Sequence, residues 1–115
     1  MTPGKYNFVC PQGATFSKQL TWAIDGDPVD LTSYSARMQV REKYTSLSTT
    51  LNLNTENGGI TLGDEEGTIQ IDVDAFTTSG IVAKDYVYDL ELISSSSIVT
   101  RLLEGRFIVT PEVTR

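Results

Sequence analysis

Apolar residues recur at every second position along most of this chain. The clearest run lies between residues 86 and 92, where tyrosine and leucine alternate with mostly polar residues. Four serines at 94–97 interrupt this run, and a second apolar-rich stretch extends from Ile98 to Val109. A two-residue period on both sides of a turn predicts a β-hairpin packed against a core.

Turn signals recur every eight to twelve residues, a spacing typical of a sandwich or a barrel. Asp25-Gly26 is the strongest of them, since a type I′ turn requires positive φ at both central positions. Lys18 interrupts an otherwise apolar face and indicates an edge strand, where the charged end of the side chain reaches water. Further strands are expected at residues 6–10, 15–24, 29–31, 35–41, 51–53, 60–62 and 68–73.

One short helix is expected at residues 74–79. Asp74 can cap it by accepting backbone N–H bonds, and Gly80 can end it with positive φ. Tyr86 then stands at the start of a late strand, the position of the tyrosine corner of immunoglobulin-like sandwiches, in which the hydroxyl bonds to upstream backbone. Two ordinary sheet aromatics are the alternative interpretation of Tyr86 and Tyr88.

These patterns predict an all-β protein: an immunoglobulin-like antiparallel β-sandwich with one short helix near residues 74–80. At 115 residues, the chain is expected to form a single domain, residues 1–115, able to bury a core without disulfide or metal. Trp22 is expected at the centre of that core. The predicted core residues are Phe16, Leu20, Trp22, Met38, Val40, Ile69, Ile71, Tyr86, Tyr88, Leu90, Leu92 and Phe107.

Little in the sequence points to catalysis. The chain has no histidine and one cysteine, Cys10, which we interpret as a small buried apolar residue. The consecutive acids Asp64, Glu65 and Glu66 fall on a turn, where side chains diverge rather than face one cleft. We therefore predict no enzymatic activity, no catalytic residues, no small-molecule substrate, no cofactor and no metal. A weak calcium site between neighbouring acidic loops stays a minor alternative.

The formal net charge of −6 argues against two partner classes. The nine lysines and arginines form no basic stripe, so binding to nucleic acid or to an anionic membrane is not expected. The first residues lack the apolar run of a signal peptide or a membrane span, which predicts a soluble protein made in the cytoplasm of the host cell. Charges of both signs instead mark the closing strands as candidate partner contacts: Arg101, Glu104, Arg106, Glu112 and Arg115.

Four segments together resemble small structural proteins of tailed bacteriophages. The first is Gly26-x-Pro28-x-Asp30-Leu31-Thr32-x-Tyr34-x-Ala36-Arg37-Met38-Gln39-Val40-Arg41, and the others lie at 57–60, 86–92 and 101–114. The chain is also similar to the N-terminal immunoglobulin-like domain of phage baseplate upper proteins. This resemblance covers nearly the whole chain, and its order and spacing carry it more than any single motif.

The resemblance implies a virion protein, most often of the tail or baseplate, that bridges other virion proteins or forms a symmetric oligomer. Binding would use sheet edges and the loops near Glu42–Ser48 and Gly63–Gly67. A capsid decoration protein is one alternative. A host-facing module that binds carbohydrate or protein is another, for which Tyr34 and Tyr44 are the loop aromatics.

Overall fold

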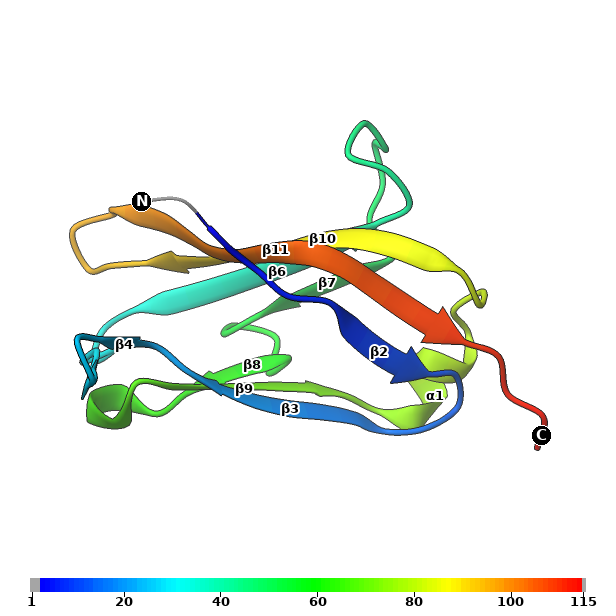
Figure 1. Cartoon of the computed structure of the whole chain (residues 1–115), viewed down its shortest axis with the longest axis horizontal. Helices are drawn as coiled ribbons and strands as arrows, with labels where there is room; N and C mark the ends of the chain where they lie inside the picture. Colours follow the sequence, from blue (N-terminus) through cyan, green and yellow to red (C-terminus); the bar gives the residue numbers. More distant parts are fainter. Residues whose placement is uncertain (1–2, 115) are drawn as a thin grey trace.

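The alternating segments assemble into two facing β-sheets, shown by the computed structural model in Figure 1, which describes residues 3–114. The first sheet has the order β1-β11-β10-β6-β7, with β2 also pairing with β11, and the second has the order β3-β9-β8. A small hairpin, β4–β5, extends from β3. The elements are β1 Gly4–Lys5, β2 Phe8–Pro11, β3 Phe16–Thr21, β4 Ala23–Ile24, β5 Asp27–Pro28, β6 Ser35–Arg41, β7 Leu51–Asn54, β8 Ile60–Leu62, the 3₁₀ helix η1 Asp64–Glu66, β9 Thr68–Val73, α1 Ala75–Ser79, β10 Asp85–Ile93 and β11 Val99–Thr110.

This arrangement confirms the predicted immunoglobulin-like sandwich. One sheet holds the hairpin β10–β11 with β6 and β7, and the other holds β3, β9 and β8, which is the division of strands in that fold. All pairings are antiparallel except those of β1 and β2, which run parallel to β11. Among the described residues, no helix is long and apolar enough to span a membrane.

The core lies between the sheets and is filled by the inward side chains of both. Ten of the twelve predicted core residues are buried there, and Phe8, Phe16 and Phe107 pack ring against ring at its centre. The prediction for Trp22 was wrong: its indole, like Leu20, is only partly buried at the margin of the core. Trp22 follows directly after β3 and lines a surface groove with Leu102 and Leu103 of β11, which leaves its side chain partly exposed. Cys10 is buried, as predicted.

The turn at Asp25-Gly26 forms as predicted, but the strand that follows it does not. Asp25 and Gly26 have φ of 52° and 84°, which confirms the type I′ signal. The return strand is β5, however, and not the predicted residues 29–31. Val29 instead donates its N–H to the Trp22 carbonyl, and Leu31 donates its N–H to the Asp64 carbonyl at 2.7 Å. These single hydrogen bonds hold residues 29–31 in place without making them a strand of a sheet.

Helix α1 begins as predicted and ends differently. The Asp74 carboxylate accepts a 2.8 Å hydrogen bond from the Thr77 N–H, which confirms the cap. Gly80 has φ −87°, so the expectation of positive φ was wrong; its N–H still bonds the last carbonyls of the helix. Thr78, which the sequence did not single out, is fully buried and bonds the Gly13 N–H and the Ala14 carbonyl.

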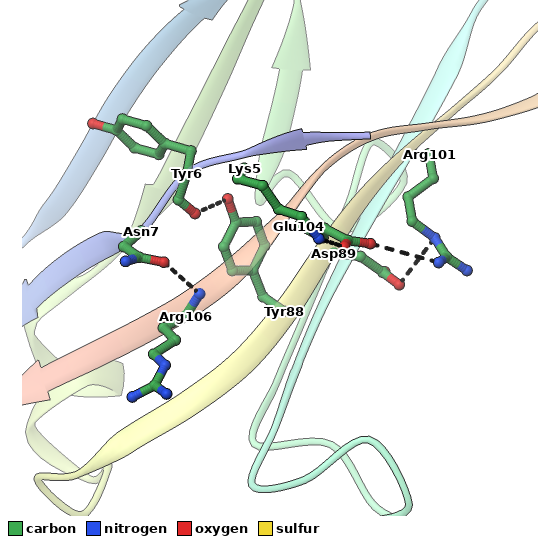
Figure 2. Close-up of polar contacts among 8 residues, drawn as sticks. All are labelled: Lys5, Tyr6, Asn7, Tyr88, Asp89, Arg101, Glu104 and Arg106. Carbon is green, nitrogen blue, oxygen red and sulfur yellow. Dashed lines mark hydrogen bonds and ion pairs between the residues drawn. The ribbon is translucent and has the colours of Figure 1, made fainter. Parts of the chain in front are cut away.

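The N-terminal segment is anchored at Tyr6 by two features of the closing hairpin. The Tyr88 hydroxyl donates a 2.6 Å hydrogen bond to the Tyr6 carbonyl (Figure 2), and burial raises the pKa of that phenol, so it keeps its proton. Directly opposite Tyr88 on β11 is Gly105, whose missing side chain lets the Tyr6 carbonyl approach. The predicted strand 6–10 is found as β2, at residues 8–11, and a separate short strand, β1, precedes it at residues 4–5.

Tyr86 forms the tyrosine corner. Its side chain is buried, and its hydroxyl donates a 2.7 Å hydrogen bond to the Val82 carbonyl, four residues upstream. We expect Tyr86→Phe to lower the free energy of unfolding by about 1 kcal/mol, because that hydrogen bond is lost without a change of shape. Urea denaturation measures the loss, and Tyr44→Phe, on a side chain that is 80% exposed, is the control. Equal stability of wild type and Tyr86→Phe would contradict a stabilising corner.

Candidate functional site

The outer surface of the first sheet gathers the charged side chains of three neighbouring strands. On β6 and β10 the inward positions are apolar, and strand alternation turns the charged residues between them to the opposite face. On β11 a register irregularity opposite Leu90 and Glu91 brings Arg101 to the same face as Glu104, three residues later. We call this surface the charged face. Its central side chains are Arg37, Gln39, Arg41, Asp89, Glu91, Arg101, Glu104 and Arg106.

Ion pairs run across the charged face from strand to strand. Arg37 donates from Nε to Glu91 Oε1 at 2.7 Å. Arg101 lies between two carboxylates, with Nε 3.6 Å from Asp89 and Nη1 3.7 Å from Glu104, and Lys5 also pairs with Glu104 (Figure 2). At 3.6–3.7 Å the Arg101 contacts are long for charge-assisted hydrogen bonds, so this guanidinium is held loosely.

Three of the five predicted partner-contacting residues meet on this face. Arg101, Glu104 and Arg106 all project from β11, and Arg106 reaches Asp85 at 3.3 Å. Glu112 lies apart from them, beyond the end of β11, where its N–H donates to the Gln12 side chain. Arg115 lies outside the described residues.

Sequence reasoning missed most of the charged face. Arg37, Asp89 and Glu91 come from β6 and β10 and join β11 only through the sheet register, in which Asp89 is opposite Glu104 and Glu91 is opposite Arg37. The signal was present, because these residues occupy the outward positions of strands whose inward positions had been identified. What was absent from the sequence was the order of the strands.

Asp89 is an acid of the charged face with a raised pKa. Burial raises the pKa of its carboxyl, and the neighbouring Glu91 and Glu104 raise that pKa further, against the opposing effect of Arg101 and Arg37. Glu104 behaves oppositely: its hydrogen bond with Lys5 lowers its pKa. Asp89 is therefore a carboxylate that the ion pairs around it do not fully neutralise.

Replacing Asp89 by asparagine is expected to stabilise the protein near neutral pH. The pKa of Asp89 is higher in the folded protein than in the unfolded chain. At a pH above the folded pKa, the ionised Asp89 carboxylate therefore lowers the free energy of unfolding. This destabilisation disappears as the pH falls through the folded pKa and the carboxylate takes up a proton. The gain is a few tenths of 1 kcal/mol, because water screens a side chain that is 39% exposed. Urea denaturation at about pH 7 and about pH 3 measures it; the two proteins converge at the lower pH.

The control for this experiment is Glu65→Gln, an exposed carboxylate of η1 that carries the same change of charge. It should leave the free energy of unfolding almost unchanged at either pH. A lower stability of Asp89→Asn at neutral pH would mean that the Arg101 contact outweighs burial, and would contradict the expected gain in stability.

A loop rises beside the charged face between β6 and β7, at residues 42–50 (Figure 1). Its tip carries Tyr44, which is 80% exposed, and Leu47, which is 100% exposed. Arg41 fastens the base of the loop by donating to the Ser46 carbonyl at 2.8 Å. Between Tyr44 and the strands lies a shallow hollow of about 280 Å³, lined also by Gln39, Asp89 and Arg101.

The aromatic residues proposed for carbohydrate contact differ in their availability. Tyr34 packs edge to face against Trp22, with ring centroids 6.4 Å apart, and is partly buried. Tyr44 is free and borders the hollow. Within residues 3–114, no group of three or more acids or cysteines is placed to hold a metal ion.

The fold and this face define the protein as an immunoglobulin-like β-sandwich with a broad, mixed-charge sheet surface. No protein-family model matches the chain, and no curated protein matches its sequence. Among solved structures it is similar to that of CopC from Methylosinus trichosporium OB3b, at a TM-score of 0.48 and 13% identity. That match covers 100% of this chain and 90% of CopC. A similarity this low assigns no function.

Proposed function

We propose that the protein is a non-enzymatic structural component of a tailed-phage virion, an adaptor of the tail or baseplate that bridges other virion proteins. The resemblance of its sequence to phage structural proteins supports the virion assignment, and the immunoglobulin-like fold is consistent with it. The observation that carries the binding role is the charged face with its exposed loop.

The charged face has the chemistry of a protein-binding surface. It is broad and shallow, and charges of both signs stand in defined register on a rigid sheet. Such patterns contribute specificity and association rate more than affinity. The loosely held Arg101 can exchange its contacts for those of a partner at little cost. Tyr44 and Leu47 add the apolar anchors that charge pairs alone do not provide.

Charge reversal at Arg101 tests this proposal. In Arg101→Glu, a third carboxylate lies beside Asp89 and Glu104, so this part of the charged face becomes acidic without any change to the core. We expect incorporation of the chain into particles to fall by about 10-fold or more. Quantitative immunoblotting of purified particles from the strain that encodes the protein measures the loss, with a Tyr44→Ala, Leu47→Ala double variant as a second disruption.

The matched control is Glu56→Arg, a charge reversal on the exposed turn between β7 and β8, which should incorporate as the wild type does. Separating disrupted particles into tails and capsids then distinguishes an adaptor from a decoration protein. Absence of the wild-type chain from particles would overturn the proposal.

A host-facing binding module is the second candidate, favoured by the exposed Tyr44 beside a hollow that offers polar groups for a sugar. Screening the purified protein on a glycan array tests it. Binding that is lost in Tyr44→Ala would support this candidate, and an array without signal would reject it.

A further inference from the structure

The sandwich is open along one side, between the N-terminal half of β11 and the end of β3. Strand β2 crosses the gap between the sheets farther along, toward the end where α1 lies (Figure 1). In the remaining part a groove of about 290 Å³ is lined mainly by Tyr6, Leu20, Trp22, Leu102 and Leu103. We call it the edge groove; it lies at a strand edge, away from the hollow beside Tyr44.

Strand β3 presents an unpaired backbone edge that leads into this groove, whose lining it joins at Leu20 and Thr21. Among the described strands it pairs only with β9. On β9, the Asp72 N–H bonds the Gly59 carbonyl, and the Thr68 carbonyl accepts from Gly63, so the even-numbered residues of β9 bond away from β3. Their partners across the β3–β9 ladder are Ser17, Gln19 and Thr21. Because antiparallel pairs alternate, these three residues turn their own N–H and C=O groups to the free edge.

Lys18 gives this edge a charge preference. Alternation places its side chain on the same face of β3 as Phe16 and Leu20, toward the interior, yet the residue is exposed because no described strand lies along the free edge of β3. Within residues 3–114 no ion pair involves Lys18. A lysine that faces inward on an edge strand disfavours the addition of an apolar strand, because the added strand would bury the ammonium group without an ionic partner.

From these observations we infer that the edge groove accepts an extended segment of a partner protein as an additional strand beside β3. The segment carries an acidic residue opposite Lys18 and apolar residues at the positions two away, which cover Leu20 and Trp22. Its backbone bonds to Ser17, Gln19 and Thr21 supply affinity, and the acid–Lys18 pair supplies selectivity, as in other cases of strand addition. The inference deepens the proposed function and rests on it for the role of the protein as a binding module.

A second copy of this chain fits the edge poorly. A two-fold pair of β3 strands centred on Gln19 would set each Lys18 opposite Leu20 of the other copy. The two Lys18 residues would then be diagonal neighbours on one face of the paired strands, with their backbones about 7–8 Å apart. Like charges at that position disfavour self-pairing, whereas a carboxylate there favours a different partner.

Synthetic peptides test the inference, with Trp22 as the reporter. It is the single tryptophan of the chain and lines the groove, so a covering strand should shift its emission to shorter wavelength. The probes are nine-residue peptides that alternate valine and threonine, with aspartate, asparagine or lysine at the central inward position and serines at both ends. We expect the aspartate peptide to bind at least about 10-fold more tightly than the lysine peptide.

Two variants separate the backbone contribution from the charge. Lys18→Glu should reverse the order of the aspartate and lysine peptides, while Lys43→Glu, the same change on the distant loop, should leave it unchanged. Gln19→Pro removes one outward N–H without touching the β3–β9 ladder, so it should abolish binding of every peptide while thermal unfolding stays cooperative.

Equal affinity of the three peptides, or full binding by Gln19→Pro, would overturn the inference. So would a dimer in sedimentation that Gln19→Pro dissociates, because the occupant would then be a second copy. Particle incorporation that depends on Arg101, with no peptide bound at millimolar concentration, would overturn this inference alone and leave the proposed function standing.

Discussion

Replacing Gly105 by alanine is expected to lower the free energy of unfolding by about 3 kcal/mol. A Cβ at this position would lie 2.2 Å from the Tyr6 carbonyl oxygen, which is a contact with backbone and not with a side chain that can move aside. Relief requires the N-terminal segment to shift off β11. That shift would weaken the Tyr88–Tyr6 hydrogen bond and the burial of Phe8, and guanidinium denaturation followed by circular dichroism measures the sum.

The control for Gly105→Ala is Gly80→Ala. An added Cβ at Gly80 meets nothing closer than the Thr77 carbonyl at 3.6 Å, and φ there is −87°, so alanine fits without strain. Its stability should equal or slightly exceed that of the wild type. If Gly105→Ala were as stable as Gly80→Ala, the segment around Tyr6 would be able to move away from β11 at no cost in stability. That result would contradict the anchoring of this segment at Tyr6.

Truncating Phe107 to alanine is expected to cost about 3–5 kcal/mol. Its ring is fully buried and packs on both Phe8 and Phe16, with centroids 6.3 Å and 5.3 Å away, so it joins β11, β2 and β3 at the centre of the core. The backbones of β11, β2 and β3 around this ring are held in place by hydrogen bonds to neighbouring strands, so the cavity that the substitution leaves cannot collapse. Equilibrium denaturation gives the value.

Phe76→Ala provides the comparison, because this phenylalanine is 88% exposed on α1. The expected change is within about 0.5 kcal/mol. A loss below about 1 kcal/mol in Phe107→Ala would mean that the sheets repack around the gap, and would contradict a rigidly held core.

Local patterns predicted the elements of this fold well. The hairpin at 85–110, the Asp25-Gly26 turn, the Asp74 cap and the Tyr86 corner each depend on a few neighbouring residues, so the sequence contains the information directly. Lys18 even identified an edge strand, since no interior position tolerates an unpaired ammonium.

Features that depend on distant parts of the chain were not predictable in this way. The parallel pairing of β1 and β2 with β11 joins residues about a hundred positions apart, and no local sequence pattern indicates it. The partial exposure of Trp22 has the same origin, because it depends on the free edge of β3, along which no described strand lies. The charged face likewise needed the strand order before its two halves could be joined.

The parallel ladder between β2 and β11 has a consequence for biosynthesis. Strand β2 cannot reach its place until β11, about a hundred residues later in the chain, has left the ribosome, so the first sheet is completed only after β11 has been made. Long-range closure of this kind slows folding relative to proteins built from local contacts. Until then β2 has no partner strand, and newly made chains would be most exposed to chaperones and proteases around Phe8.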